Sequence, residues 1–149
     1  DGPSAVSRVM DTGIPPYITG SSVIGVLAQR LVRKLCRRCT EQVEPTEKEL
    51  EQLQLSEKQA SKIRFHRARG CHNCRNTGYS GRTALYELMV VNSEVREAIT
   101  EGANASELRK IAVESGMKTL KYDGLAKINA GITSANEVAG VMLIGDELG

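Results

Sequence analysis

Residues 31–40 read LVRKLCRRCT, and a second pair of cysteines with the same spacing follows in the stretch GCHNCR. All cysteines of the chain belong to these two pairs: Cys36, Cys39, Cys71 and Cys74. A C-x-x-C turn directs two sulfur atoms at one point, and two such turns supply four ligands that close a tetrahedral coordination sphere. We therefore predict that the four cysteines bind one structural zinc ion. A catalytic zinc ion would keep one position open for water.

Two other interpretations of the cysteines fit the pattern less well. Thioredoxin-like dithiols would be expected in βαβ surroundings, and unrelated buried thiols are rarely spaced so regularly. Here 31 residues (40–70) separate the first knuckle, 36–39, from the second, 71–74. A simple zinc ribbon has roughly 15–20 residues there, so we expect an insertion between the knuckles. His72 is an alternative ligand, but four thiolates suffice and we expect it to be solvated; His66 is expected at the surface.

Composition limits the fold and the class of function. The chain has 149 residues, enough for one domain or two small modules. Hydrophobic residues make up 40% of it and aromatic residues only 3%, which predicts an aliphatic core. A net charge of +2 is too small to indicate nucleic-acid binding by itself. No apolar stretch approaches the roughly 18 residues of a membrane span and no signal segment is seen, so we expect an intracellular chain without structural disulfides.

Hydrophobic spacing predicts a mainly α fold with a small β element. Residues 1–35 are expected to be largely helical, with a non-helical connection at IPPYITG because of its two prolines. The stretch VIGVLAQRLVRKL is predicted as a helix, since Leu27, Leu31 and Leu35 recur with the helical period.

The spacer and the tail carry helix and strand signals. In the spacer, Thr46 with Glu49 and Ser56 with Gln59 form two capping boxes, which predict two short helices. The spacer is rich in glutamate, and we expect its acidic side chains to be solvated or to pair with the basic flanks of the knuckles. GRTALYELMVV suits a strand, and several short helices that end at glycines follow it and are expected to form a bundle.

No catalytic motif is present in the chain. GSSVIG, residues 20–25, has the two glycines of a phosphate-binding loop but is followed by Val26 and Leu27, where that loop needs Lys and then Ser or Thr. Helix termini explain the glycines better. No nucleophile elbow, metalloprotease motif or carboxylate pair is seen, so we expect no catalytic activity from this chain alone.

Four stretches, in order, resemble the C-terminal end of the type II secretion and type IV pilus assembly ATPases. They are AVSRVMDTG, SSVIGVLAQRLVRKLC, GCHNCRNTGYSGRTALYELM and SGMKTLKYDGLAKINAGITSANEV. The four cysteines match the tetracysteine zinc site of that family. Gln29 and Arg30 match its A-Q-R-L segment, which assigns them no chemistry here. One departure is Arg37, where many members have Pro; it affects the stiffness of the turn and not the ligands.

The resemblance implies a longer parent protein. In this family the phosphate-binding loop, the acidic magnesium box and the histidine box lie upstream, and Asp1 is expected to follow the histidine box. ATP and Mg²⁺ are therefore expected only in the parent. Residues 1–35 are expected to be the tail of a RecA-like ATPase domain, 36–84 an inserted tetracysteine zinc module and 85–149 a C-terminal helical subdomain. Apolar residues of the first part are then expected to be exposed or paired between chains: Val6, Val9, Ile24 and Leu27.

The implied parent is a hexameric ATPase that is cytoplasmic and peripheral to the bacterial inner membrane. Its expected partners are neighbouring subunits and inner-membrane platform proteins of secretion or pilus assembly. The basic residues near the knuckles leave anionic lipid open as a further partner. The alternative function is a zinc-ribbon nucleic-acid-binding module, against which the acidic spacer and the scarcity of aromatic residues argue. The basic residues in question are Arg33, Lys34, Arg37, Arg38, Arg64, Arg67, Arg69, Arg75 and Arg82.

Overall fold

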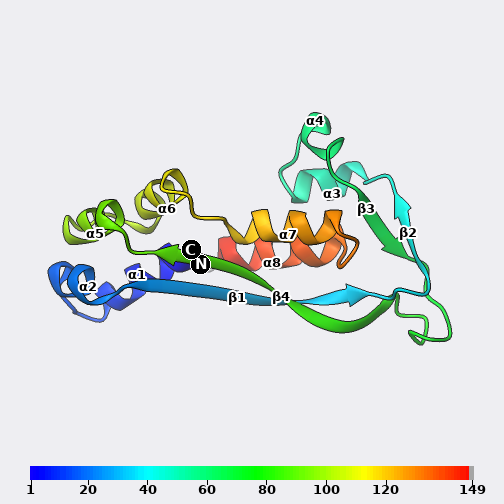
Figure 1. The fold of residues 1–149 in the computed structure, drawn as a ribbon, viewed down its shortest axis with the longest axis horizontal. Helices are drawn as coiled ribbons and strands as arrows, with labels where there is room; N and C mark the ends of the chain where they lie inside the picture. Colours follow the sequence, from blue (N-terminus) through cyan, green and yellow to red (C-terminus); the bar gives the residue numbers. More distant parts are fainter. Residues whose placement is uncertain (148–149) are drawn as a thin grey trace. The chain divides into compact units, whose positions relative to one another are not determined.

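The structure is a computed structural model that describes residues 1–147, with side chains described through Met142. The described chain forms helices and two small two-stranded sheets (Figure 1). The long strands β1 (Gly25–Leu35) and β4 (Tyr79–Val90) pair with each other, and the short strands β2 (Thr40–Val43) and β3 (Phe65–Ala68) form the second sheet. The chain divides into two compact units, and both long strands pass from one unit into the other.

The first unit comprises Asp1–Gln29 and Tyr86–Leu120. Its helices are α1 (Gly2–Asp11), α2 (Pro16–Ser22), α5 (Ser93–Thr100) and α6 (Ala105–Glu114). These helices and strand β4 enclose an aliphatic core, as the composition predicts. Its buried members are Val6, Met89, Val91, Val95, Ala98, Ile99, Leu108 and Ala112. The buried carboxylate of Glu87 accepts the backbone N–H groups of Gly2 at 3.1 Å and Leu120 at 3.0 Å. These bonds satisfy the otherwise unpaired first N–H of two helices.

The second unit comprises Arg30–Leu85 and the chain from Lys121 onward. It holds the β2–β3 sheet, in which Thr40 lies opposite Ala68 and Val43 opposite Phe65 in antiparallel register. Its helices are α3 (Glu47–Gln52), α4 (Glu57–Ala60), α7 (Leu120–Asn129, whose first residue is counted with the first unit) and α8 (Ala135–Glu147). Helices α7 and α8 lie side by side (Figure 1) because Gly124 has no side chain; a Cβ there would lie 2.6 Å from Val138 Cγ1.

Several predicted elements are confirmed. Both capping boxes of the spacer are present, at the starts of α3 and α4. The strand predicted for GRTALYELMVV is β4, and short helices follow it.

Two predictions for the first 35 residues are wrong. The stretch predicted as a helix through VIGVLAQRLVRKL is strand β1 from Gly25 onward, and side chains on its two faces alternate between outward and inward. The stretch IPPYITG is not a connection throughout, because α2 starts at Pro16. Proline is favoured in the first turn of a helix, where its missing N–H has no partner to lose.

The apolar residues expected to be exposed divide into two groups. Val6 is 2% exposed and belongs to the core of the first unit, so the expectation is wrong for it. Val9, Ile24 and Leu27 are exposed, Ile24 at 81%. Leu27 lies on the outward face of the β1–β4 sheet, which carries further exposed apolar side chains: Tyr86, Leu88 and Val90. An antiparallel sheet with one face in water usually carries polar side chains there.

Candidate metal centre

The folding of the second unit brings the two knuckles together. The first knuckle is the turn between β1 and β2, and Thr40 N donates to Cys36 O at 3.0 Å to close it. The second follows β3, and its turn is closed by Asn76 N, which donates to Cys71 O at 2.8 Å. The β2–β3 pairing sets the knuckles side by side, and Cys36 N donates to Gly78 O at 2.9 Å.

The four sulfur atoms converge on one point. Their Sγ atoms all lie within 4.8 Å of one another. Individual Sγ–Sγ distances are 3.8 Å for Cys36–Cys71, 3.9 Å for Cys39–Cys74 and 3.7 Å for Cys71–Cys74. Four sulfurs at the Zn–S distance of about 2.3 Å around a tetrahedral ion would be separated by about 3.8 Å. The cysteines are therefore spaced as a four-thiolate metal site requires.

Hydrogen-bond donors surround the sulfurs. The Cys74 sulfur accepts from the backbone N–H of Cys71 at 3.2 Å and of Gly78 at 3.3 Å. The Asn73 amide lies 3.8 Å from the Cys36 sulfur. Such donors favour the thiolate and orient the ligands of a metal site.

The thiols differ in their tendency to ionise. The backbone N–H of Arg38 lowers the pKa of Cys36. Burial raises the pKa of Cys74, but the N–H groups of Cys71 and Gly78 outweigh it and bring that pKa to about 6. Burial, together with the neighbouring thiols, raises the pKa of Cys39 to about 12. Four crowded thiols do not ionise together unaided, and a bound dication supplies the charge that deprotonates a coordinating thiol.

Neither histidine belongs to the cysteine cluster. Among the described residues, the group placed to hold a metal contains the four cysteines and not His72, which is exposed. The prediction that His66 lies at the surface is met only in part, because its ring is half-buried and Nδ1 lies 3.1 Å from Ile128 O. Its packing beside Gly131 depends on tertiary structure, which no local pattern around His66 indicates.

The basic residues around the knuckles are partly paired with the acidic spacer. Arg67 forms an ion pair with Glu49 at 2.8 Å, and Arg69 with Glu41 at 3.1 Å. The two contacts realise one of the two alternatives expected for the acidic spacer, pairing with basic residues, at Glu49 and Glu41. Arg33 instead pairs with Glu137 of α8 at 2.8 Å and stacks over the ring of Tyr79 at 4.1 Å.

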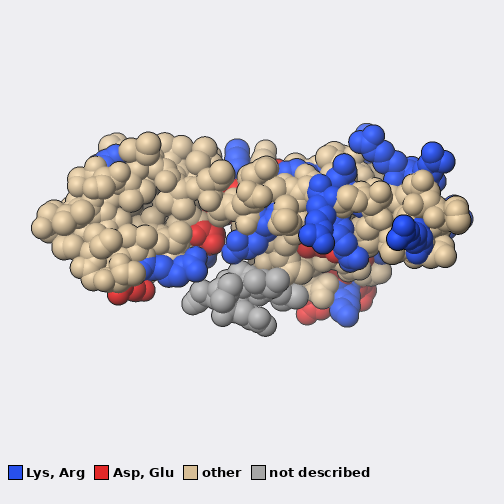
Figure 2. All heavy atoms as spheres, turned by 90° about the horizontal axis from the view of Figure 1, so that it is seen from below, with Lys and Arg blue, Asp and Glu red and all other residues tan. Residues whose placement is uncertain are grey.

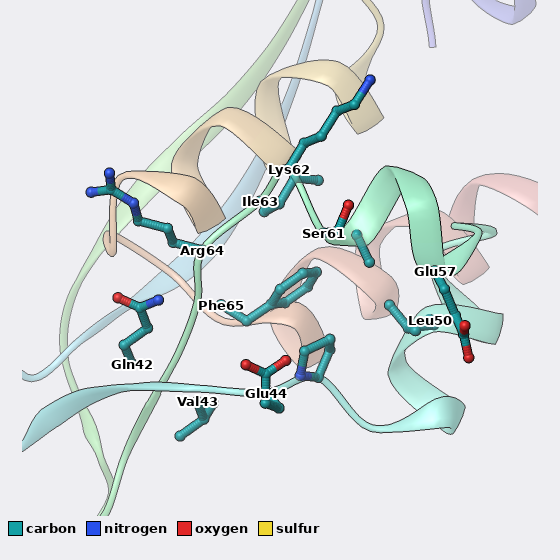
Figure 3. A pocket seen from close by; sticks show the side chains of 12 residues that line it. Gln42, Val43, Glu44, Leu50, Glu57, Ser61, Lys62, Ile63, Arg64 and Phe65 are labelled. Carbon is teal, nitrogen blue, oxygen red and sulfur yellow. The ribbon is translucent and has the colours of Figure 1, made fainter.

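A separate hollow of about 490 Å³ lies between the end of the β2–β3 sheet and helices α3 and α4 (Figure 3). Its walls are apolar near Leu50, Ile63 and Phe65, while Glu44, Glu57, Lys62 and Arg64 bring charge to its rim. Figure 3 shows the two basic side chains directed away from the two carboxylates. The hollow therefore lacks a convergent set of titratable groups for catalysis.

The glycines of GSSVIG have structural roles. Gly20 lies inside α2, where a Cβ would lie 2.6 Å from Thr100 Oγ1, so it permits the close approach of α2 to α5. Gly25 begins β1. A phosphate-binding loop joins a strand to a following helix, and here the order is reversed. Close packing, more than the predicted helix termination, accounts for Gly20.

None of the helices in the described part of the chain combines the length and the apolar character needed to cross a membrane.

Comparison with known proteins identifies the family. Residues 1–140 match the family described as "Type II/IV secretion system protein". The type IV pilus assembly ATPase PilB of Thermus thermophilus is 44% identical over 93% of this chain and 16% of its own length. The type II secretion system ATPase E of Vibrio cholerae is 41% identical over 90% of this chain and 26% of its own length. The type II secretion system protein HxcR of Pseudomonas aeruginosa is 37% identical over 93% of this chain and 25% of its own length.

The matched region is small in each relative, since the chain spans about a quarter or less of their length. The predicted resemblance is confirmed by both kinds of comparison. Because the family match covers nearly the whole chain, the protein is a member of the type II/IV secretion system protein family.

Proposed function

We propose that this chain forms the C-terminal, zinc-binding part of an ATPase that drives type II secretion or type IV pilus assembly. The family match and the names of the relatives support the ATPase part of this proposal. The observation that carries the zinc part is the spacing of the four sulfurs, 3.7–3.9 Å in the three pairs measured. Cys36, Cys39, Cys71 and Cys74 would be the ligands.

The role of the metal is structural. Strands β2 and β3 have four residues each, and an isolated two-stranded sheet is at best marginally stable in water. A four-thiolate zinc site contributes folding free energy to a small module in a chain that has only 3% aromatic residues. Zinc would thereby hold the module in a fixed shape for mechanical work.

The parent assembly is a hexameric ring at the cytoplasmic side of the bacterial inner membrane. Its upstream parts would hold ATP and Mg²⁺, while residues 1–35 complete a RecA-like domain, 36–84 form the zinc module and 85–149 a helical subdomain. Neighbouring subunits and inner-membrane platform proteins are the partners. The exposed apolar residues on the outward face of the long sheet support a protein contact there: Leu27, Tyr86, Leu88 and Val90.

Metal content tests the zinc part directly. Native mass spectrometry of the purified chain is expected to find one zinc ion per molecule. The variant Cys71→Ser is expected to lose that ion, because three thiolates leave the coordination sphere open. His72→Ala lies next to the same ligand and is the matched control, with zinc retained. A metal-free but folded wild-type chain, or cysteines joined as disulfides, would refute the assignment.

Activity tests the enzyme part. The isolated chain is expected to release no phosphate from ATP, because the sequence lacks a phosphate-binding loop. A phosphate-release assay on the purified chain measures this. ATP turnover that scales with the amount of protein would contradict the proposal.

Nucleic-acid binding is the second candidate function. It is supported by the Lys and Arg side chains gathered over the part of the second unit that carries the knuckles, at the right of Figure 2. The ion pairs of Arg67 and Arg69 with the spacer weaken this case, as does the 3% aromatic content. Strong, salt-dependent binding to duplex or single-stranded DNA would support it. Its absence at low salt would remove it.

A further inference from the structure

A cationic hollow lies beside the first knuckle, outside the cysteine cluster. It has a volume of about 240 Å³ and is lined by Lys34, Leu35, Arg37, Arg38, Asn73 and Ser80. Three of these side chains are basic, two are neutral hydrogen-bonding groups, and none is a carboxylate. The hollow therefore concentrates positive charge without an acidic side chain in its walls.

The three cations of this hollow differ from other basic residues of the second unit. Within the described part of the chain, Lys34, Arg37 and Arg38 have no acidic side chain within ion-pair distance. By contrast, Arg67 and Arg69 pair with the spacer. Three like charges around one small hollow repel one another, so an anion placed among them relieves an unfavourable interaction.

The backbone that carries the three cations is held by the fold. Arg37 and Arg38 lie in the first knuckle, where the Arg38 N–H donates to the Cys36 sulfur. Lys34 belongs to β1, and Ser80 to β4, which pairs with it. Asn73 comes from the second knuckle and its amide contacts the Cys36 sulfur. A site assembled from four fixed segments loses less conformational entropy on binding than one on a mobile loop.

We propose that this hollow binds a phosphate group. A guanidinium offers two parallel N–H donors that match a phosphate, and an ammonium adds a point charge. Asn73 and Ser80 supply neutral donors for the remaining oxygens. The lining has no aromatic side chain and only Leu35 as an apolar one, so it suits a phosphate better than a base or an acyl chain. The group can come from a free phosphate compound or from a lipid headgroup.

Titration of the zinc-loaded wild-type chain with inorganic pyrophosphate, followed by amide chemical shifts, tests the site. Saturable shifts are expected at the lining residues, and sodium chloride at matched ionic strength is expected to leave them unchanged. Shifts that map elsewhere, or an absence of saturation with both pyrophosphate and the lipid probe described below, would overturn the proposal. This titration uses the wild-type chain, so its result does not depend on whether a substitution disturbs the folding of the knuckle.

Two triple variants with the same change in charge test specificity. K34Q/R37Q/R38Q removes the cations of the hollow, and affinity is expected to fall on the order of tenfold or more. K48Q/K58Q/K62Q removes three exposed lysines of the same unit that line no part of this hollow, and affinity is expected to stay within about twofold. Equal losses in both variants would show diffuse attraction and overturn the site.

Vesicles distinguish the two sources of the phosphate. Co-sedimentation with phosphatidylcholine vesicles that contain phosphatidic acid, compared with phosphatidylcholine alone, presents the group on a lipid. Binding to these vesicles without saturable pyrophosphate binding assigns the site to a lipid headgroup. Saturable pyrophosphate binding without vesicle binding assigns it to a free phosphate compound. Either result supports the proposal if the observed binding is lost in K34Q/R37Q/R38Q. The zinc assignment is independent, since it depends on the four sulfur atoms.

Discussion

Gly78 combines a left-handed backbone with two hydrogen bonds to residues of the cysteine cluster. Its φ is +80°, its N–H donates to the Cys74 sulfur, and its carbonyl accepts from Cys36 N. A Cβ there would lie 3.1 Å from Ala68 O. We predict that Gly78→Val weakens zinc binding by about tenfold or more, because a left-handed β-branched residue costs about 1–3 kcal/mol before the clash is counted. Competition with a chromophoric chelator measures the affinity.

Gly102 provides the control for this variant. Its φ is +81°, almost the same, but no atom lies within 4 Å of a Cβ built there, and it belongs to the first unit. Gly102→Val therefore carries the backbone penalty without touching the metal centre. Zinc affinity is expected to be unchanged in it. An unchanged affinity in Gly78→Val as well would show that this glycine is incidental.

The ion pair between Arg33 and Glu137 gives a prediction for pH. Burial raises the pKa of Glu137, but hydrogen bonds and charge from Arg33 outweigh it, so that pKa lies below its ordinary value. A lowered carboxyl pKa contributes stability above the unfolded-state pKa, which is lost as pH falls through the folded-state value. We predict that Glu137→Gln lowers the melting temperature by a constant amount above about pH 5, and that the difference disappears in acid.

The size of this effect is limited by solvent. The side chain of Arg33 is 55% exposed, so the pair is expected to contribute less than about 1 kcal/mol. Cysteine thiolates also take up protons in acid, so the control is Glu44→Gln, an exposed glutamate of the same unit without an ion pair among the described residues. A difference between the two variants that grows as the pH falls would contradict the prediction.

Single residues were predictable from sequence where their chemistry is local. The cysteine cluster follows from spacing alone, because each C-x-x-C turn fixes two of the four sulfurs. Gly20 and Glu87 gave no such signal, since their roles depend on partners about 80 residues away in the chain: Thr100 for the glycine and Gly2 for the carboxylate. His66 is half-buried, not freely exposed, for a similar reason, because its ring contacts Ile128, which lies 62 residues away in the chain.

At the scale of elements, β1 shows how a hydrophobic pattern can fit two structures. Leu27, Leu31 and Leu35 recur every fourth residue, which fits one face of a helix and equally one face of a strand. In the structure the faces alternate, so Val32 is 2% exposed while Leu31 is 58% exposed. Pairing with β4 decides between the two, and that partner lies more than 40 residues away along the chain.

Adjacent residues of β1 test this alternation. We predict that Val32→Ala destabilises the second unit by about 2 kcal/mol, because it removes buried methyl groups. Leu31→Ala is expected to change the free energy of unfolding by less than about 0.5 kcal/mol, because its side chain is mostly in water. Urea unfolding in excess zinc measures both. Equal effects of the two substitutions, or a larger effect of Leu31→Ala, would contradict the alternating burial of this segment.

Helix starts were predictable and the short strands were not. Each spacer helix begins with a capping box, in which two residues three positions apart accept each other's backbone N–H groups. This signal is local and can be read from the sequence. Strands β2 and β3 read TEQV and FHRA, which lack the alternating apolar pattern of a half-buried strand. Their pairing joins residues 40–43 to residues 65–68, which are far apart in the chain and lie next to the two knuckles.

At the scale of the whole molecule, the division into two units was not visible in the sequence. Each unit combines segments that are far apart along the chain, and the long strands enter both. Because the chain passes between the units within strands β1 and β4, no Pro- or Gly-rich linker marks the boundary between them. The core of the first unit contains no residue of the zinc module, since every member lies in Asp1–Gln29 or Tyr86–Leu120.

Removal of the metal is expected to affect the two units differently. We predict that a strong chelator abolishes amide-hydrogen protection in β2 and β3, because the proposed zinc ion would join the two knuckles at the ends of these strands. Protection at Val95, Ile99 and Leu108 should persist, because these side chains are fully buried in a core that the metal does not touch. Hydrogen exchange with and without chelator, read residue by residue, makes the comparison, and restoring zinc should restore the sheet. Loss of protection in both units together would mean that they unfold as one body, and unchanged protection in β2 and β3 would mean that the sheet does not depend on metal.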